Sequence, residues 1–200
     1  MTHDFDSDLR FEQSKFAVQN SFYQRLYGSD IRIERADYDT PAGRMLQRKD
    51  IDLILHLPNG KSISISEKHR TAFYGDILVE FYSMFPHTLG WMDNSEADVM
   101  TYFVPGKVVM INKKELVNFY KTTLKNLNFE QLFSQLVSAN PRRSARESQF
   151  VTINGRREKV TIIQAYNHPY GSINSWYTES VAISLNILRR NGVTCDEYEL

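Results

Sequence analysis

Ile51-Asp-Leu-Ile-Leu-His-Leu-Pro-Asn-Gly-Lys-Ser-Ile-Ser-Ile-Ser-Glu-Lys-His69 is the stretch from which the expected fold follows. Its first seven residues are mostly Ile and Leu, and residues 62–66 alternate polar and apolar side chains, as a half-exposed strand does. Between these two runs lies Asn59-Gly60, and both residues tolerate the positive φ that a two-residue hairpin turn requires. The stretch therefore predicts a β-hairpin whose second strand leads into Glu67 and Lys68.

The segments on either side of this hairpin complete a pattern of helices and strands. Apolar spacing predicts a helix over residues 7–27, which Ser7 can cap and Gly28 can end. The alternating residues 31–35 predict a strand before the hairpin. After the hairpin we expect a short helix over 75–82, with Ile77, Leu78 and Phe81 on one face, and then a strand over 98–104. The first half of the chain thus reads helix, strand, strand, strand, helix, strand.

The second half predicts further hairpins and helices. The turn Pro105-Gly106 pairs residues 98–104 with 107–111, and the Asn112-x-x-Glu115 pattern opens a helix through about residue 126. A short helix over 129–137, a hairpin around Asn154-Gly155 and a last helix over 176–190 follow. With 200 residues we expect one α/β (α+β) domain, in which residues 112–200 form a helical and hairpin extension packed on a core of residues 1–111.

Composition excludes several classes of protein. No apolar run reaches the roughly 18 residues that a membrane span needs, so we expect a cytoplasmic protein without membrane contact. The single Cys195 excludes a disulfide framework and a thiolate zinc site. Lys and Arg number 24, as do Asp and Glu, so any contact with nucleic acid must come from local patches. No Walker loop, dinucleotide-binding glycine pattern or nucleophile elbow occurs in the sequence.

The order of elements and the charged residues together resemble the PD-(D/E)XK nuclease superfamily, whose restriction-endonuclease-like core is αβββαβ around a central mixed sheet. Asp52 lies in the second expected strand, and Glu67-Lys68 ends the third. Over residues 48–105 the chain also resembles uncharacterised phage and prophage proteins. They carry an acid-Glu-Lys followed by Tyr-Gly-Asp-Ile-Leu and an acidic residue. The corresponding positions here are Ser66-Glu67-Lys68, residues 74–78 and Glu80.

The resemblance implies a metal-dependent nuclease that hydrolyses phosphodiester bonds, with DNA as its partner. Asp52 and Glu67 would bind Mg²⁺ or Mn²⁺, which polarises the phosphate and lowers the pKa of the attacking water. Lys68 would stabilise charge, and Glu80 would complete the catalytic set. Arg48, Lys49 and Arg70 suit contact with the nucleic acid. The apolar neighbours of Asp52 support this interpretation, since an unpartnered carboxylate beside a buried face costs several kcal/mol.

One departure from the family pattern concerns the acid that should stand two residues before Lys68, because that position holds Ser66. Side chains alternate along a strand, so Glu67 and Lys68 should face opposite sides. Three repairs remain open: a Glu-x-His variant that uses His69, a β-bulge, or an acid from the next element, Asp76 or Glu80. Glu12 on the first helix is a further acidic candidate, with a plain surface position as its alternative. The fourth outcome is loss of activity.

The alternatives to an active nuclease are also open. Acidic and basic residues at strand ends are common as solvated surface charges. Ser66 and the neutral net charge both favour a catalytically inactive nuclease-fold module that binds nucleic acid or protein, such as a phage-borne or host-defence factor. The C-terminal half would supply specificity or the contacts of a homodimer. Two carboxylates within about 5 Å share a cation, whereas Asp52 and Glu67 on opposite faces of the sheet do not.

Overall fold

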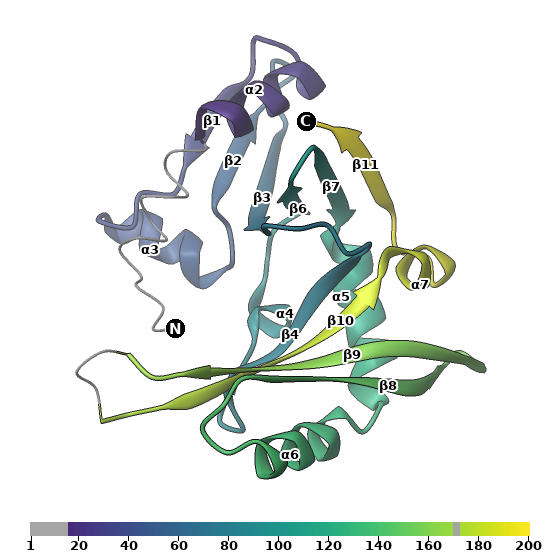
Figure 1. The fold of residues 1–200 in the computed structure, drawn as a ribbon. Helices are drawn as coiled ribbons and strands as arrows, with labels where there is room; N and C mark the ends of the chain where they lie inside the picture. The colour runs from purple at the N-terminus through teal and green to yellow at the C-terminus, as the bar shows by residue number, and fades with distance from the viewer. Residues whose placement is uncertain (1–15, 170–172) are drawn as a thin grey trace.

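The computed structural model describes residues 16–169 and 173–200, which form two β-sheets with helices packed against them (Figure 1). In order across the first sheet, called sheet A, lie β1 (Arg32–Arg35), β2 (Leu53–His56), β3 (Ser62–His69), β6 (Val99–Val104), β7 (Lys107–Asn112) and β11 (Cys195–Glu199). Sheet A is mixed, because β3 and β6 are parallel and its other neighbours are antiparallel.

The second sheet, called sheet B, is antiparallel. In order across it lie β5 (Thr88–Leu89), β4 (Asp76–Phe85), β10 (Trp176–Ser184), β9 (Arg156–Asn167) and β8 (Ala145–Ile153). The protein is therefore a mixed α+β structure in which the two halves of the chain share both sheets: β4 pairs with β10, and β11 pairs with β7.

The helices pack against both sheets, and those that contact sheet A lie on both of its faces. They are α2 (Phe16–Tyr27), α3 (Pro41–Arg48), α4 (Trp91–Asn94), α5 (Lys113–Thr122), the 3₁₀ turn η1 (Leu124–Asn126), α6 (Phe129–Ala139) and α7 (Leu185–Arg190). Phe22 and Tyr23 of α2 pack with Leu53 and Ile65 of sheet A in one apolar core. In Figure 1, α6 lies below sheet B, and its buried side chains belong to a larger core with those of β4, β9 and β10.

Local turn and capping chemistry confirms several sequence predictions. The Asn59-Gly60 turn joins β2 to β3, and Gly60 has φ 81°. Pro105-Gly106 joins β6 to β7, and Asn154-Gly155 joins β8 to β9 with φ values of 48° and 79°. The Asn112 side chain accepts a hydrogen bond of 3.2 Å from the backbone N–H of Glu115, so α5 begins as the sequence indicates.

The expected helix over 75–82 is wrong, because these residues lie in β4. Ile77, Val79 and Phe81 point into the core in strict alternation, so the buried side chains repeat every two residues, as in a strand. The helix expected over 176–190 is wrong for 176–184, which form β10, while α7 begins after the Ser184 cap. The connection from β3 to β6 therefore passes through β4 and β5 of sheet B and the short α4. Glu80 lies on β4 in this connection.

The remaining differences concern the ends and loops. The helix expected over 7–27 is confirmed for Phe16–Tyr27, and Ser7 and Glu12 lie outside the described residues. Between β1 and β2 lies α3, whose first turn Thr40 caps by accepting a hydrogen bond from the backbone N–H of Gly43. Across residues 16–169 and 173–200, no helix has the length and apolar character that a bilayer crossing requires.

Candidate active site

A cavity of about 610 Å³ collects the residues that the sequence singled out. Its lining includes Asp52 and three residues from strands of both sheets, Glu67, Lys68 and Glu80. His69, Arg70 and the aromatic residues Tyr38, Trp91 and Tyr102 also line it. The four expected catalytic residues thus share one cavity, although they reach it from different directions.

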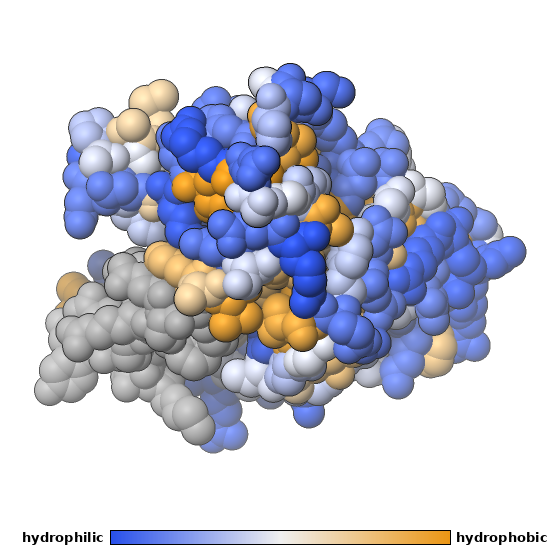
Figure 2. All heavy atoms as spheres, turned by 90° about the horizontal axis from the view of Figure 1, so that it is seen from above, coloured by the Kyte–Doolittle hydropathy of each residue, from blue (hydrophilic) through white to orange (hydrophobic). Residues whose placement is uncertain are grey.

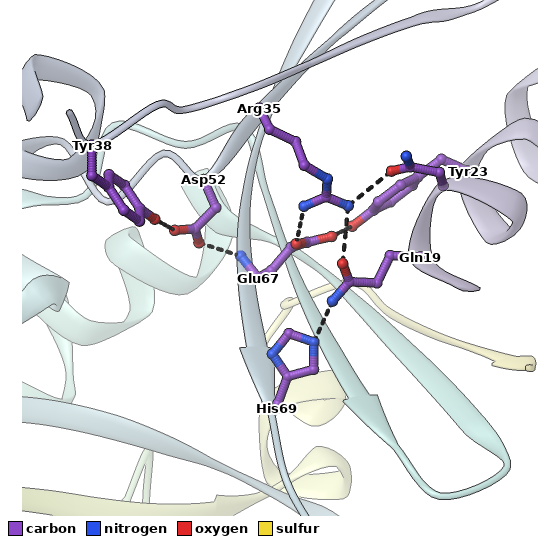
Figure 3. A network of polar contacts seen from close by, with 8 residues as sticks. Gln19, Tyr23, Arg35, Tyr38, Asp52, Glu67 and His69 are labelled. Atoms are coloured by element: carbon purple, nitrogen blue, oxygen red, sulfur yellow. Dashed lines mark hydrogen bonds and ion pairs between the residues drawn. The ribbon is translucent and has the colours of Figure 1, made fainter. Parts of the chain in front are cut away.

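Strand alternation assigns each acidic residue to a face of sheet A. Leu53 pairs with Ile65, and both pack against α2 in the core. Asp52 directly precedes β2, so it shares the opposite face with Ser66 and Lys68, while Glu67 shares the α2 face with Ile65. Figure 3 shows the Asp52 and Glu67 carboxylates directed to opposite sides of β3. A cation shared between Asp52 and Glu67 is therefore not supported.

Asp52 is held by two hydrogen bonds at the end of the β2–β3 hairpin. Its Oδ2 accepts one of 2.6 Å from the backbone N–H of Glu67, and its Oδ1 accepts one of 2.9 Å from the Tyr38 hydroxyl (Figure 3). The backbone contact fixes the carboxylate to β3, and Tyr38 fixes it from the loop before α3. Asp52 is therefore oriented before any ligand arrives.

Glu67 belongs to a separate polar network under α2. Its Oε2 lies 2.7 Å from Arg35 Nη1, its Oε1 accepts a hydrogen bond of 3.0 Å from the Tyr23 hydroxyl, and its side chain is only 5% exposed. Burial raises the pKa of this carboxyl, and the Arg35 guanidinium opposes that rise. Arg35 also donates to Gln19 and Asn20. Both Glu67 oxygens thus have protein donors, and a cation directly beside this carboxylate would be repelled by the guanidinium.

Lys68 faces the space between the two sheets as a cation. Its Nζ lies 2.7 Å from Asp50 Oδ1. Burial favours the neutral amine, but the negative charges of Asp50 and Asp52 prevail and raise the pKa of Lys68 to about 12. At neutral pH Lys68 therefore supplies positive charge and cannot accept a proton.

Glu80 approaches the same lysine from sheet B. Its Oε1 accepts a hydrogen bond of 3.3 Å from the backbone N–H of Trp91, the first residue of α4. Burial raises the pKa of Glu80, and the positive charge of Lys68 opposes that rise. A Cβ added to Gly90 would lie 2.4 Å from the Glu80 carbonyl oxygen, so this close approach of α4 requires glycine. The negative charges of Asp52, beside sheet A, and of Glu80, on sheet B, thus both interact with the positive charge of Lys68.

Asp50 and Lys113 belong to the same charged group, and the sequence patterns did not point to them. Asp50 follows α3 with φ 56°, a conformation that Asp tolerates better than most residues. Its Oδ2 lies 3.6 Å from Lys113 Nζ. Lys113 is 1% exposed, its Nζ lies 3.7 Å from the centre of the Trp91 ring, and burial lowers its pKa to about 7.

The other predicted residues have defined partners or an exposed position. His69 stacks on Phe103 and contacts Gln19. Arg70 pairs with Asp76. Lys49 pairs with Glu96, and Arg48 is exposed on α3. Of the three basic residues expected to contact nucleic acid, only Arg70 lines the cavity. The predicted Glu-x-His arrangement is not formed, because Glu67 binds Arg35 and His69 binds Gln19.

Asp52 and Glu80 are the residues of this cavity that could hold a divalent cation. Within the described ranges, no three His, Cys, Asp or Glu residues are grouped as a complete protein cage for a metal. Mg²⁺, however, is usually held by one or two carboxylates, with water and substrate phosphate as the other ligands. Asp52 and Glu80 supply two carboxylates to one cavity. Ser66 Oγ on the face of Asp52 is buried without a hydrogen-bond partner in the described structure, so it is a further polar group of that face.

No family model, curated protein or solved structure matches the chain.

Proposed function

We propose that this protein is a metal-dependent nuclease-like enzyme that hydrolyses phosphodiester bonds, with DNA as its substrate. The observation that carries the proposal is that Asp52, Lys68 and Glu80 line one cavity. Glu80 would there take the place of the acid missing at Ser66. A restriction-endonuclease-like core is part of the proposal. It is supported by the antiparallel order β1-β2-β3 and by β6, which lies parallel to β3.

Each residue then has a role that follows from its surroundings. Asp52 and Glu80 would hold Mg²⁺ or Mn²⁺, and Glu67 anchors α2 and Arg35 below the site. Lys68 stabilises the negative charge that develops on the phosphate, since its high pKa keeps it protonated. Asp50 is a positioning residue that holds Lys68.

Hydrolysis proceeds by attack of water on phosphorus, with cleavage of the bond to the leaving oxygen, which takes up a proton. The bound cation would lower the pKa of the attacking water and polarise the phosphate. Arg70, which lies between Asp76 and the Tyr102 ring at the cavity wall, adds a second positive charge for the phosphate.

The test is Mg²⁺- or Mn²⁺-dependent cleavage of single-stranded, duplex and branched DNA. We expect wild type to cleave at least one substrate and Asp52→Ala, Lys68→Ala and Glu80→Gln to lose cleavage while remaining folded by circular dichroism. Asp39→Asn is the matched control, because Asp39 is an exposed carboxylate on the lining of the same cavity. Cleavage that survives in all three site variants, or that Asp39→Asn also abolishes, would contradict the assignment.

A second candidate function is a non-catalytic module with the same fold. It is favoured by Ser66 at the position of the expected acid. It is also favoured by the ion pair with Arg35, which engages the Glu67 carboxylate of the motif. Absence of cleavage on every substrate, together with no cation binding in calorimetry, would select this function.

A further inference from the structure

The β8–β9 hairpin presents one face that packs on the core and one that does not. Val160 and Ile162 of β9 are buried in the core below sheet B. Register and alternation place the neighbouring positions on the opposite face, called here the ribbon face, which consists of Arg146, Ser148, Phe150, Thr152, Arg157, Lys159, Thr161 and Ile163. On β8 these residues are exposed, as are Arg157 and Lys159.

The ribbon face is basic although the chain as a whole is neutral. Arg146, Arg157 and Lys159 lie on it, and none of its positions is Asp or Glu. The acidic residues of the hairpin, Glu147 and Glu158, have the opposite parity. Figure 2 looks down on this side, and the end of the molecule that the hairpin forms is mainly hydrophilic. Arg142 and Arg143, both exposed, extend the positive charge before β8.

An aromatic ring lies among these charges. Phe150 is 58% exposed, and it stays so although the Arg157 guanidinium lies 4.2 Å from the centre of its ring. An exposed aromatic ring set among basic side chains is the combination that surfaces binding single-stranded nucleic acid use. Unpaired bases stack on such rings, whereas the bases of a duplex already stack on one another.

The ribbon face continues across sheet B into the cavity. Cross-strand pairing aligns Arg146 with Ile163, Ile163 with Ser180, and Ser180 with Glu80. Ser180 and Glu80 both line the cavity. Since neighbouring strands lie about 4.8 Å apart, Arg146 is roughly 14 Å from the Glu80 position along this row. A strand of nucleic acid crossing the sheet along the row would pass from basic residues to the site.

We propose that the ribbon face binds single-stranded DNA and leads it to the cavity. Arg146, Arg157 and Lys159 contact phosphates, and a base stacks on Phe150. This inference rests on the proposed function for its substrate, because it assigns the surface that holds the DNA that the cavity would cleave.

The experiment measures binding separately from cleavage. Fluorescence anisotropy of a labelled 20-nucleotide oligo-dT and of a duplex of the same length is recorded in EDTA at several salt concentrations. The variants are Arg157→Gln/Lys159→Gln and Phe150→Ala. The matched control is Lys61→Gln/Lys121→Gln, which removes two charges from exposed lysines outside the ribbon face.

We expect the basic double variant to bind oligo-dT at least about tenfold more weakly and to reduce the salt dependence, log K against log salt, by about 1.4. Phe150→Ala should weaken oligo-dT binding at least about fivefold and leave duplex binding within twofold. The control should stay within twofold of wild type throughout. Equal weakening by the control, or wild-type affinity in both ribbon variants, would overturn the proposal.

The two proposals fail in different ways. If the ribbon variants lose DNA binding and wild type shows no metal-dependent cleavage, the nuclease proposal is contradicted and the binding surface is supported. If wild type cleaves DNA and the ribbon variants cleave it with an unchanged KM, the nuclease proposal is supported and the binding surface is contradicted.

Discussion

Arg35 Nη1 lies 2.7 Å from Glu67 Oε2, and the two side chains are 17% and 5% exposed. This ion pair decides the role of Glu67, because it joins β1 to β3 under α2, at the edge of the cavity and on the face of sheet A opposite to Asp52 and Lys68. Arg35 also rests on the Phe16 ring at 4.0 Å. The pair is therefore expected to contribute to stability and to leave cation binding to other residues.

Removal of Arg35 alone should strongly destabilise the fold. Arg35→Met leaves the buried Glu67 without its cation, which we expect to lower the free energy of unfolding by about 3–5 kcal/mol in urea denaturation. Arg35→Met/Glu67→Met should recover most of that loss. Arg32→Met on the same strand is the control, because the Arg32–Glu34 pair is largely exposed and should contribute little to stability. A loss in Arg35→Met no larger than that in Arg32→Met would contradict this role.

The two glutamates of the motif should behave differently in cleavage. Glu67→Gln keeps the size of the side chain and lies off the cation face, so metal-dependent cleavage should persist once the protein is folded. Glu80→Gln removes a carboxylate from the cavity and should abolish cleavage. Steady-state cleavage rates at saturating Mn²⁺ distinguish the two variants. Loss of cleavage in Glu67→Gln with cleavage retained in Glu80→Gln would indicate that Glu67, and not Glu80, binds the cation.

Asp50→Asn tests the contact that positions Lys68. Loss of the 2.7 Å ion pair frees the amine to move, and we expect kcat to fall about 10- to 100-fold with KM within twofold. Removal of the negative charge should also lower the pKa of Lys68, so the decline of the rate at high pH should begin at a lower pH than in wild type. An unchanged pH profile would exclude this function of Asp50.

Glu179 should make stability depend on pH. It is buried in β10, neither carboxylate oxygen has a hydrogen-bond partner in the described structure, and burial raises its pKa to about 8 from 4.5. The folded state retains this proton between those values. The stability that the group contributes is therefore complete below about pH 4.5 and is lost as the pH rises through 8.

Glu179→Gln is the matched variant, because it cannot ionise. Wild type should lose stability relative to the variant by up to about 1.4 kcal/mol per pH unit between about pH 5 and 8, with no further loss above that range, measured by urea unfolding at pH 5.5, 7 and 8.5. Parallel pH dependences of the two proteins would show that Glu179 is not protonated in the fold.

The sequence was informative where structure depends on neighbouring residues. The Asn59-Gly60 turn and the Asn112 cap need only a few adjacent positions, and both were predicted. Opposite faces for Glu67 and Lys68 also followed from alternation along β3. Residues 75–82 were assigned to a helix because eight apolar and acidic residues fit a period of 3.6 almost as well as a period of two.

The parts that could not be predicted depend on packing between distant segments. Asp50 reaches the site because of a positive φ after α3, and Lys113 because α5 begins beside Trp91. No local pattern signals either contact. Glu80 was named as a replacement for the missing acid, but the strand that carries it and its position opposite β3 required the tertiary structure.

In the proposed site, Asp52 beside β2 and Glu80 of β4 would bind one cation between them. The most direct test of this site is the affinity for Mn²⁺, followed by electron paramagnetic resonance of the free ion, with a phosphorothioate oligonucleotide present to supply non-cleavable phosphates. We expect wild type to bind one Mn²⁺, and we expect Asp52→Asn and Glu80→Gln each to bind Mn²⁺ at least about tenfold more weakly. Equal affinity in all three proteins, or no binding by wild type, would contradict it.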